Sequence, residues 1–309
     1  MTKKKKCKIG GIVLKNLQLV IGTIFLTIFL VLAAFGPYLP FVDHGLKEET
    51  MQMHDSKIII PPYPPSKDHL FGSDHKGRDL LSLLVMGTRE TLLIVIVVVV
   101  IRFSLAVPLG MAAMVSRPLN AFLGGWNYIL SFIPPIFLVA LLLGIPFIFF
   151  STHRPFWYVV ILSSIEVGRL ATMVKNDAKY VSNQLFVKAA ISTGCTRVKL
   201  FTRHIFPHLK SQLITSFVND LARVLFLLSQ LAVVQLFLNQ KFTSELDGSY
   251  SAENISLAYP MYLQTISRDI WSSYWVPLYS VLFISLMIIT FLLLADGLKK
   301  HFKAKYRMF

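Results

Sequence analysis

The chain has 309 residues, of which 54% are hydrophobic and only 15% are charged, against about 25% charged in an ordinary soluble domain. Uncharged apolar stretches long enough to cross a bilayer recur along it, which excludes a soluble globular domain and predicts an integral membrane protein. The formal net charge is +15, and its meaning depends on where the charges lie relative to the membrane. Two cysteines, Cys7 and Cys195, cannot build a disulfide framework.

The first predicted membrane helix lies within residues 16–42, with its densest apolar part at 19–35. A basic segment precedes it, so a cleaved signal peptide is the alternative. The apolar core of a signal peptide has about 7–15 residues, and this stretch is longer and lacks a small-x-small cleavage site. We therefore expect an uncleaved helix.

Five further spans are predicted in chain order. The second covers 91–116 and is interrupted only by Arg102. The third stretch, 118–153, is too short for two crossings and a turn, so it predicts one helix that is bent or unwound near Pro134 and Pro135 and ends near Pro146. The remaining spans are 155–174, 211–239 and 270–295. The predicted fold is therefore all-α and integral to the membrane, with six transmembrane helices.

The charges predict the orientation of these helices. With the N-terminus in the cytoplasm, the inner segments hold 20 of the 31 basic residues and the outer segments hold 12 of the 16 acidic residues. This distribution follows the positive-inside rule and predicts that both termini and both cysteines are cytoplasmic. The +15 charge is then explained by the membrane orientation, and no nucleic-acid partner is expected.

The predicted organisation has five parts. They are a basic cytoplasmic tail (1–15), the first transmembrane helix (16–36), an extracytoplasmic loop (37–90), a five-helix transmembrane core with an inner loop at 175–207 (91–296), and a second basic cytoplasmic tail (297–309).

The inner loop is predicted to form a helix, a turn at Gly194 and a second helix over 196–206 that runs to Pro207 and joins the fifth span. The small residues Ala189, Ala190 and Gly194 would let another protein approach closely. A basic hairpin that binds anionic lipid is the alternative interpretation.

Several motifs of the chain resemble those of a known family. K-A-A at 188–190, Gly194 and I-F-P at 205–207 resemble the E-A-A–G–I-x-L-P loop of ABC importer permeases. F-G-S-D-H-K-G-R-D at 71–79 resembles the outer-loop motif G-[ST]-D-x-x-G-R-D of dipeptide, oligopeptide and nickel importer permeases. V-P-L-G at 107–110 and D-G-L at 296–298 also fit. The resemblance covers about residues 15–305.

The resemblance implies the type I ABC importer permease fold, in which the inner loop docks on a cytoplasmic ATPase. The resemblance assigns this docking role to the matching positions of this sequence, which are Lys188, Ala189, Ala190, Gly194, Ile205 and Pro207. The sequence departs from the family pattern at Lys188, where the family has glutamate, at Asn127, where an acidic residue is usual, and in the run after the fifth span.

The implied partners are a second related permease, two ATPase subunits, an extracytoplasmic peptide-binding protein and the lipid bilayer of a bacterial cell membrane. The chain has no G-x-x-x-x-G-K-[ST] motif, so it binds no cofactor directly, and ATP is used through the partner subunits. The expected function is import of di- or oligopeptides. The alternatives are import of nickel or another small solute, and a degenerate regulatory or interaction protein that does not transport.

Four intramembrane charges are candidates for pathway lining or for structural pairing. Arg102 could pair with Glu166 across helices, and Asp220 could pair with Arg223 on one helix face. The outer-loop residues Gly72, Asp74, Gly77, Arg78 and Asp79 are expected to be structural, with the glycines in turns. No catalytic constellation is expected, because Ser, His and Asp are scattered across opposite sides of the membrane. No metal site is expected either. The outer-loop histidines and carboxylates have no fixed ligand spacing, and the pair His204 and His208, four residues apart, has Pro207 between its members and no third ligand.

Overall fold

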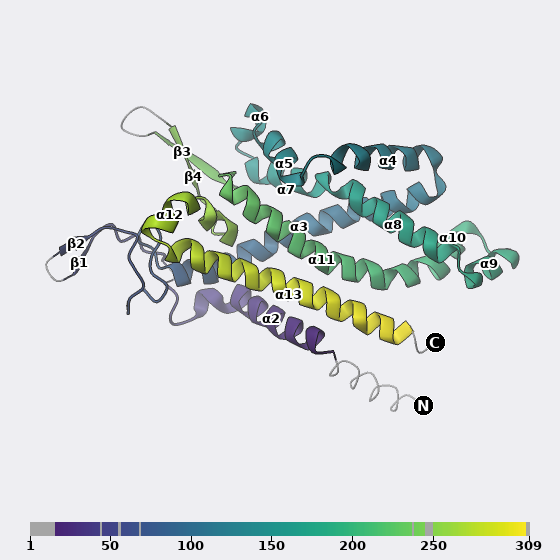
Figure 1. Ribbon diagram of the computed structural model, residues 1–309, viewed down its shortest axis with the longest axis horizontal. Coiled ribbons are helices and arrows are strands. Elements are labelled where there is room, and N and C mark those ends of the chain that lie inside the picture. The colour runs from purple at the N-terminus through teal and green to yellow at the C-terminus, as the bar shows by residue number, and fades with distance from the viewer. Residues whose placement is uncertain are drawn as a thin grey trace.

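The computed structural model describes residues 16–43, 45–54, 57–67, 69–236, 238–244 and 250–306. The predicted tail at 1–15 and residues 307–309 lie outside these ranges. The described chain is an elongated bundle of helices (Figure 1). Its helices are α2 (Leu17–Phe35), α3 (Leu80–Val115), α4 (Arg117–Ser131), α5 (Pro135–Leu143), α6 (Pro146–Phe149), α7 (Arg154–Ile165), α8 (Val167–Ser182), α9 (Leu185–Ser192), α10 (Arg197–Leu200), α11 (Phe206–Val233), α12 (Ile266–Ser272) and α13 (Trp275–Tyr306).

The predicted all-α membrane fold is confirmed. Five helical segments are long and apolar enough to cross a bilayer: Leu17–Tyr38, Leu80–Val115, Arg154–Ser182, Phe206–Val233 and Trp275–Ala304. A sixth span is made if α4 and α5 are counted together. They are bent by 90° at the break before Pro135, close to the proline pair where the sequence predicts a bend. Proline causes this break because it lacks a backbone donor and its ring disfavours helical backbone in the preceding residue.

The helix α3 begins at Leu80 rather than at Thr91, so residues 80–90 belong to the bundle and not to the outer loop. The charged Arg89 and Glu90 interrupt the apolar pattern of the sequence. For this reason the sequence does not predict that the membrane helix includes these residues. The true start is the N-cap residue Asp79, whose carboxylate accepts hydrogen bonds from the backbone N–H of Ser82 at 2.8 Å and from its hydroxyl at 2.6 Å.

Replacing Asp79 with alanine is expected to lower the free energy of unfolding by about 1 kcal/mol, because the first turn of α3 loses an N-cap. Asn is the matched control, since an Asn side chain also caps helices well and should recover most of the loss. Thermal unfolding of the purified protein in detergent measures both variants. Equal losses for Ala and Asn would contradict a capping role.

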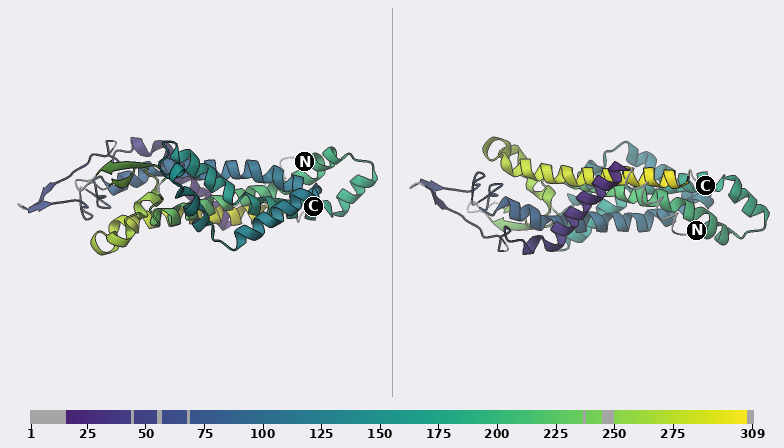
Figure 2. Two further views of the ribbon diagram at one scale, coloured as in Figure 1. Left: turned by 90° about the horizontal axis from the view of Figure 1, so that it is seen from above. Right: turned by 90° about the horizontal axis from the view of Figure 1, so that it is seen from below.

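The two ends of the bundle differ. One end carries α9 and α10, and at this end α2 begins and α13 ends (Figures 1 and 2). The other end carries α12 and two antiparallel hairpins, β1 (Gln52–His54) with β2 (Lys57–Ile59) and β3 (Gln240–Ser244) with β4 (Tyr250–Asn254). The sequence pattern does not predict these hairpins. Because the hairpins and the α9–α10 region lie at opposite ends, they would face opposite sides of a membrane.

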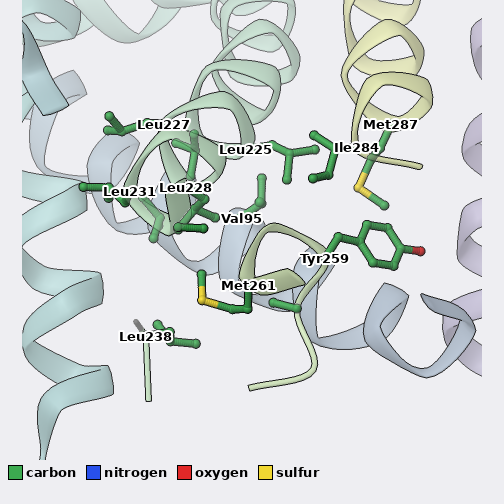
Figure 3. Packing of buried hydrophobic residues seen from close by; sticks show 14 of the residues in the cluster. Val95, Leu225, Leu227, Leu228, Leu231, Leu238, Tyr259, Met261, Ile284 and Met287 are labelled. Carbon is green, nitrogen blue, oxygen red and sulfur yellow. The ribbon is translucent and has the colours of Figure 1, made fainter. Parts of the chain in front are cut away.

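The core lies where α3, α11, α13 and the 3-10 helix Tyr259–Leu263 meet. Leu225 and Leu228 of α11 pack with Met287 of α13 and with Met261 below them (Figure 3). Tyr259 is fully buried, and its backbone N–H donates to the Thr91 hydroxyl at 3.0 Å. The segment before α13 is therefore fixed to α3 by both apolar packing and hydrogen bonds.

Candidate functional site

Arg102 is at the centre of a buried charge network within the bundle. Its side chain has no exposed surface. Its Nη1 donates to Glu166 Oε2 and to Asp220 Oδ2, each at 2.8 Å, so one guanidinium connects α3, the α7–α8 junction and α11. The predicted approach of Arg102 to Glu166 is therefore found in the structure. A charge in this position is stabilised only by partners within the bundle, since lipid offers none.

The fourth predicted span is broken at Glu166, which separates α7 from α8. At the break, the Glu166 N–H bonds to Ser164 O and no longer satisfies the Leu162 carbonyl four residues earlier. Arg102 Nη2 donates to that carbonyl at 2.6 Å. Arg102 thus neutralises two carboxylates and also satisfies a backbone group that the helix break frees, as buried backbone requires.

Arg169 completes the network, although it is not among the charged residues for which the sequence predicts pairing. Its Nη2 donates to Glu166 Oε2 and to Asp220 Oδ1, each at 3.0 Å. The suggested pairing of Asp220 with Arg223 is wrong, because Asp220 binds Arg102 and Arg169 instead. Arg223 is exposed on α11 and forms no ion pair among the described residues. The spacing of three between Glu166 and Arg169 was the available signal.

A cavity of about 340 Å³ lies beside this network, between α4, α5, α7 and α8. Its apolar walls are Leu130, Pro135, Leu138 and Ile165. Its polar groups are Asn127, Glu166, Arg169 and Thr172. The cavity is therefore mostly apolar with a few convergent polar groups, which is typical of small-molecule sites.

The inner loop has the predicted helix and glycine turn. The helix is α9, and Gly194 follows it with φ +77°, a left-handed conformation that favours glycine. The Gly194 N–H donates to Ile191 O at 3.0 Å, and the Cys195 N–H donates to Ala190 O at 3.1 Å. These bonds close the helix end and direct the chain back toward the bundle.

The second loop helix joins the fifth span, as predicted, although that span begins as α11 at Phe206 rather than at Ser211. The α10 helix continues through a π-helical turn, Phe201–Ile205, directly into α11. The Phe206 N–H donates a hydrogen bond to Phe201 O, five residues earlier in the chain. Pro207 has no backbone N–H and therefore needs no acceptor. A π-turn accommodates the proline without ending the helix, so the loop and the fifth span form one continuous element.

A groove of about 620 Å³ follows the inner face of this loop. Ala189, Ala190 and Gly194 line it together with Lys199 and Arg203. Lys188 is exposed on α9 but does not line this groove, and Ile205 is buried against α8 and α11. Gly194 leaves open space beside it, since a Cβ there would meet nothing within 4 Å. The small residues thus shape a surface that is accessible in this chain.

The outer-loop motif forms a compact turn closed by Asp74. Its Oδ2 accepts from Arg78 Nε at 2.8 Å and from Nη2 at 2.6 Å, and its Oδ1 accepts from the Arg78 N–H at 2.9 Å. Burial lowers the pKa of Arg78, but its attraction to Asp74 outweighs this and leaves that pKa raised. Gly72 and Gly77 have φ of +80° and +76°. The motif thus holds the loop together and also attaches it to the bundle, through the Asp79 cap of α3 and the contact of His75 with Asp269 of α12.

Glu90 is a structural residue that the sequence analysis missed. Its carboxylate accepts from the Ser256 hydroxyl at 2.5 Å and from the Leu257 N–H at 2.8 Å, across 167 residues of sequence at the outer end of α3. Nothing in the local pattern identified these partners, because they come from a loop that is distant in the chain.

Comparison with known proteins identifies the family to which this chain is similar. A family model described as "Binding-protein-dependent transport system inner membrane component" matches residues 104–308. The Dipeptide transport system permease protein DppC of Bacillus subtilis (strain 168) is 24% identical over 298 residues, 95% of this chain and 84% of that protein. The Oligopeptide transport system permease protein OppC of Haemophilus influenzae is 27% identical over 240 residues, 77% of this chain and 71% of that protein.

A relative from Brucella suis biovar 1, whose name assigns it to a peptide transport system, is 28% identical over 198 residues. The match covers 63% of this chain and 62% of that protein, so the chain spans less than two thirds of the length of this relative.

Proposed function

Since this chain belongs to the family of binding-protein-dependent transport system inner membrane components, we propose that it is the permease subunit of an ATP-driven importer of short peptides. The peptide cargo is supported by relatives named for dipeptide and oligopeptide transport. The chain would form half of the translocation pathway, paired with a second permease. An extracytoplasmic binding protein would deliver the peptide.

The observation that best supports a role in coupling to ATPase subunits is the position of the inner loop. The α9 helix, the Gly194 turn and α10 project from one end of the bundle, and the loop continues without interruption into α11 (Figure 1). A force on this loop would reach Asp220 of α11 and thus the charge network. Two cytoplasmic ATPase subunits are the proposed partners here, and ATP hydrolysis would be theirs.

The orientation follows from the same elements. The loop end would be cytoplasmic, because the segments predicted to be cytoplasmic from the sequence, which include this loop, carry 20 of the 31 basic residues. Both termini would then lie inside a bacterial cell membrane. The hairpins at the opposite end would face the binding protein.

Reconstitution tests this function. The permease pair, both ATPases and the binding protein are placed in proteoliposomes with ATP on the ATPase side, and uptake of labelled L-alanyl-L-leucine is measured. ATP-dependent uptake is the expected result. Uptake of nickel without peptide uptake would support the small-solute alternative, and a complete absence of uptake would support a non-transporting protein.

Replacing Lys188 with glutamate is expected to weaken co-purification of the ATPases by about tenfold, equivalent to about 1.4 kcal/mol. The reason is that Lys188 is exposed on α9, the first helix of the proposed docking loop, where charge reversal would oppose a complementary acidic surface. Lys299→Glu is the control, because Lys299 is exposed on α13 and makes the same charge change outside the loop. Undiminished co-purification of K188E would remove Lys188 from the docking surface.

A further inference from the structure

The cavity between α4, α5, α7 and α8 has unused hydrogen-bonding groups. Arg169 makes both of its ion pairs through Nη2, and its Nε and Nη1 have no partner among the described residues. Glu166 likewise receives both arginines on Oε2, which leaves Oε1 without a partner in the described chain. A cationic donor and an acceptor are therefore available at one polar wall.

Asn127 provides a second acceptor on the opposite helix. Its Nδ2 donates to Gly168 O at 3.0 Å and to the Thr172 hydroxyl. These bonds fix the orientation of the amide, and Oδ1 makes no hydrogen bond within the described structure. The polar wall thus has fixed groups whose capacity is only partly used, and a ligand with both a donor and an acceptor would complete it.

The charges around the cavity favour an anion. Arg102 and Arg169 balance Glu166 and Asp220 within the network. Arg223 also acts electrostatically on Glu166, so three arginines act on this carboxylate at the cavity wall. The Arg169 side chain is 38% exposed. Ionisable side chains within transmembrane segments face water-filled cavities or the bundle interior.

From these observations we propose that the cavity binds the carboxy-terminal end of a short peptide. The terminal carboxylate binds Nη1 of Arg169, and the last backbone N–H donates to Asn127 Oδ1 or to Glu166 Oε1. An apolar carboxy-terminal side chain packs on Leu130, Leu138 and Ile165. The volume of 340 Å³ is at the small end of the range of about 300–1,000 Å³ for such pockets. This inference rests on the proposed function, because it assumes that peptides are the cargo.

The test is cysteine protection in the assembled transporter, without its binding protein, in nanodiscs. Leu138→Cys is introduced on the cavity wall in a background where Cys7 and Cys195 are replaced by serine, and the reaction of the introduced thiol with a water-soluble maleimide is timed. L-alanyl-L-leucine is expected to slow this reaction in proportion to occupancy, about tenfold at about ten times its Kd. Thr152→Cys, exposed outside the cavity, is the control and should react at an unchanged rate.

Two blocked peptides identify the recognised group. N-acetyl-L-alanyl-L-leucine keeps the carboxylate and is expected to protect the thiol of the L138C variant. L-alanyl-L-leucine amide lacks the negative charge and is expected not to protect it. Equal protection by the amide, no protection by any peptide, or no reaction of the L138C thiol in any nucleotide state would each overturn the proposal.

A second pair of variants avoids the charge network, where Arg169→Gln could disturb folding. Leu138→Trp fills the cavity and is expected to reduce peptide uptake by about tenfold or more, a change of about 1.4 kcal/mol. Leu141→Trp, on the exposed face of the same helix, is expected to transport normally. Unchanged uptake by L138W would overturn the cavity site while leaving the importer function intact. Peptide protection of the L138C thiol without uptake of any peptide would instead contradict the importer function.

Discussion

Arg102→Met is expected to lower the free energy of unfolding by about 3–5 kcal/mol, the usual cost of removing one partner from a buried ion pair. Arg102 is completely buried and donates to Glu166, to Asp220 and to the Leu162 carbonyl. Without it, two carboxylates share only Arg169, and a freed backbone carbonyl has no donor. Methionine retains the apolar volume but replaces none of these bonds. Denaturation of the purified protein in mixed micelles would measure the loss.

The charge explanation of this loss is tested by the double variant Arg102→Met, Asp220→Asn. It leaves Arg169 and Glu166 as a balanced pair, so it should be more stable than R102M alone although it carries one more substitution. The Leu162 carbonyl stays unsatisfied, so recovery should be partial. If the double variant were less stable than R102M, the loss would come from packing and not from an uncompensated charge.

The sequence was informative about charges because charged residues are rare in its spans. Arg102 and Glu166 stood out for this reason, and they do meet. The partner of Asp220 was predicted wrongly because a spacing of three identifies only neighbours on one helix, while the break at Glu166 brings Arg169 toward α11. The periodic spacing of residues along a helix does not indicate where that helix breaks.

The inner loop could be predicted because glycine and small residues have local conformational effects. The same local reasoning predicted that the second loop helix joins the fifth span, and the structure joins them through a π-turn that keeps the helix continuous. The hairpins and the role of Glu90 depend on pairing between distant segments, which a single sequence does not specify. Local chemistry therefore predicted the elements, and tertiary contacts decided where they begin, bend and pair.

The attachment of α2 to the bundle depends on a close crossing with α13. A Cβ added to Gly297 would lie 2.6 Å from both Cα and N of Leu19, and one added to Gly22 would lie 2.8 Å from Leu294 N. At the same crossing, Asn16 Nδ2 donates to Gly297 O at 2.7 Å. Glycine permits such backbone approach, which stabilises helix pairs in membranes where the hydrophobic effect does not. The family model begins at residue 104, so α2 lies outside the matched core and is held partly by this contact.

Gly297→Ala is accordingly expected to lower the free energy of unfolding by about 1–3 kcal/mol, because the added methyl group must displace the backbone of α2. Gly124→Ala is the matched control, since Gly124 is also helical and has nothing within 4 Å of an added Cβ. There the better helix propensity of alanine should leave stability unchanged or raise it by up to about 1 kcal/mol. Thermal unfolding of both variants in the same detergent compares them directly. Stability changes of opposite sign in the two variants would establish the close approach of α2 and α13 as the cause. Equal stability changes would mean that α2 is held by its apolar side chains alone.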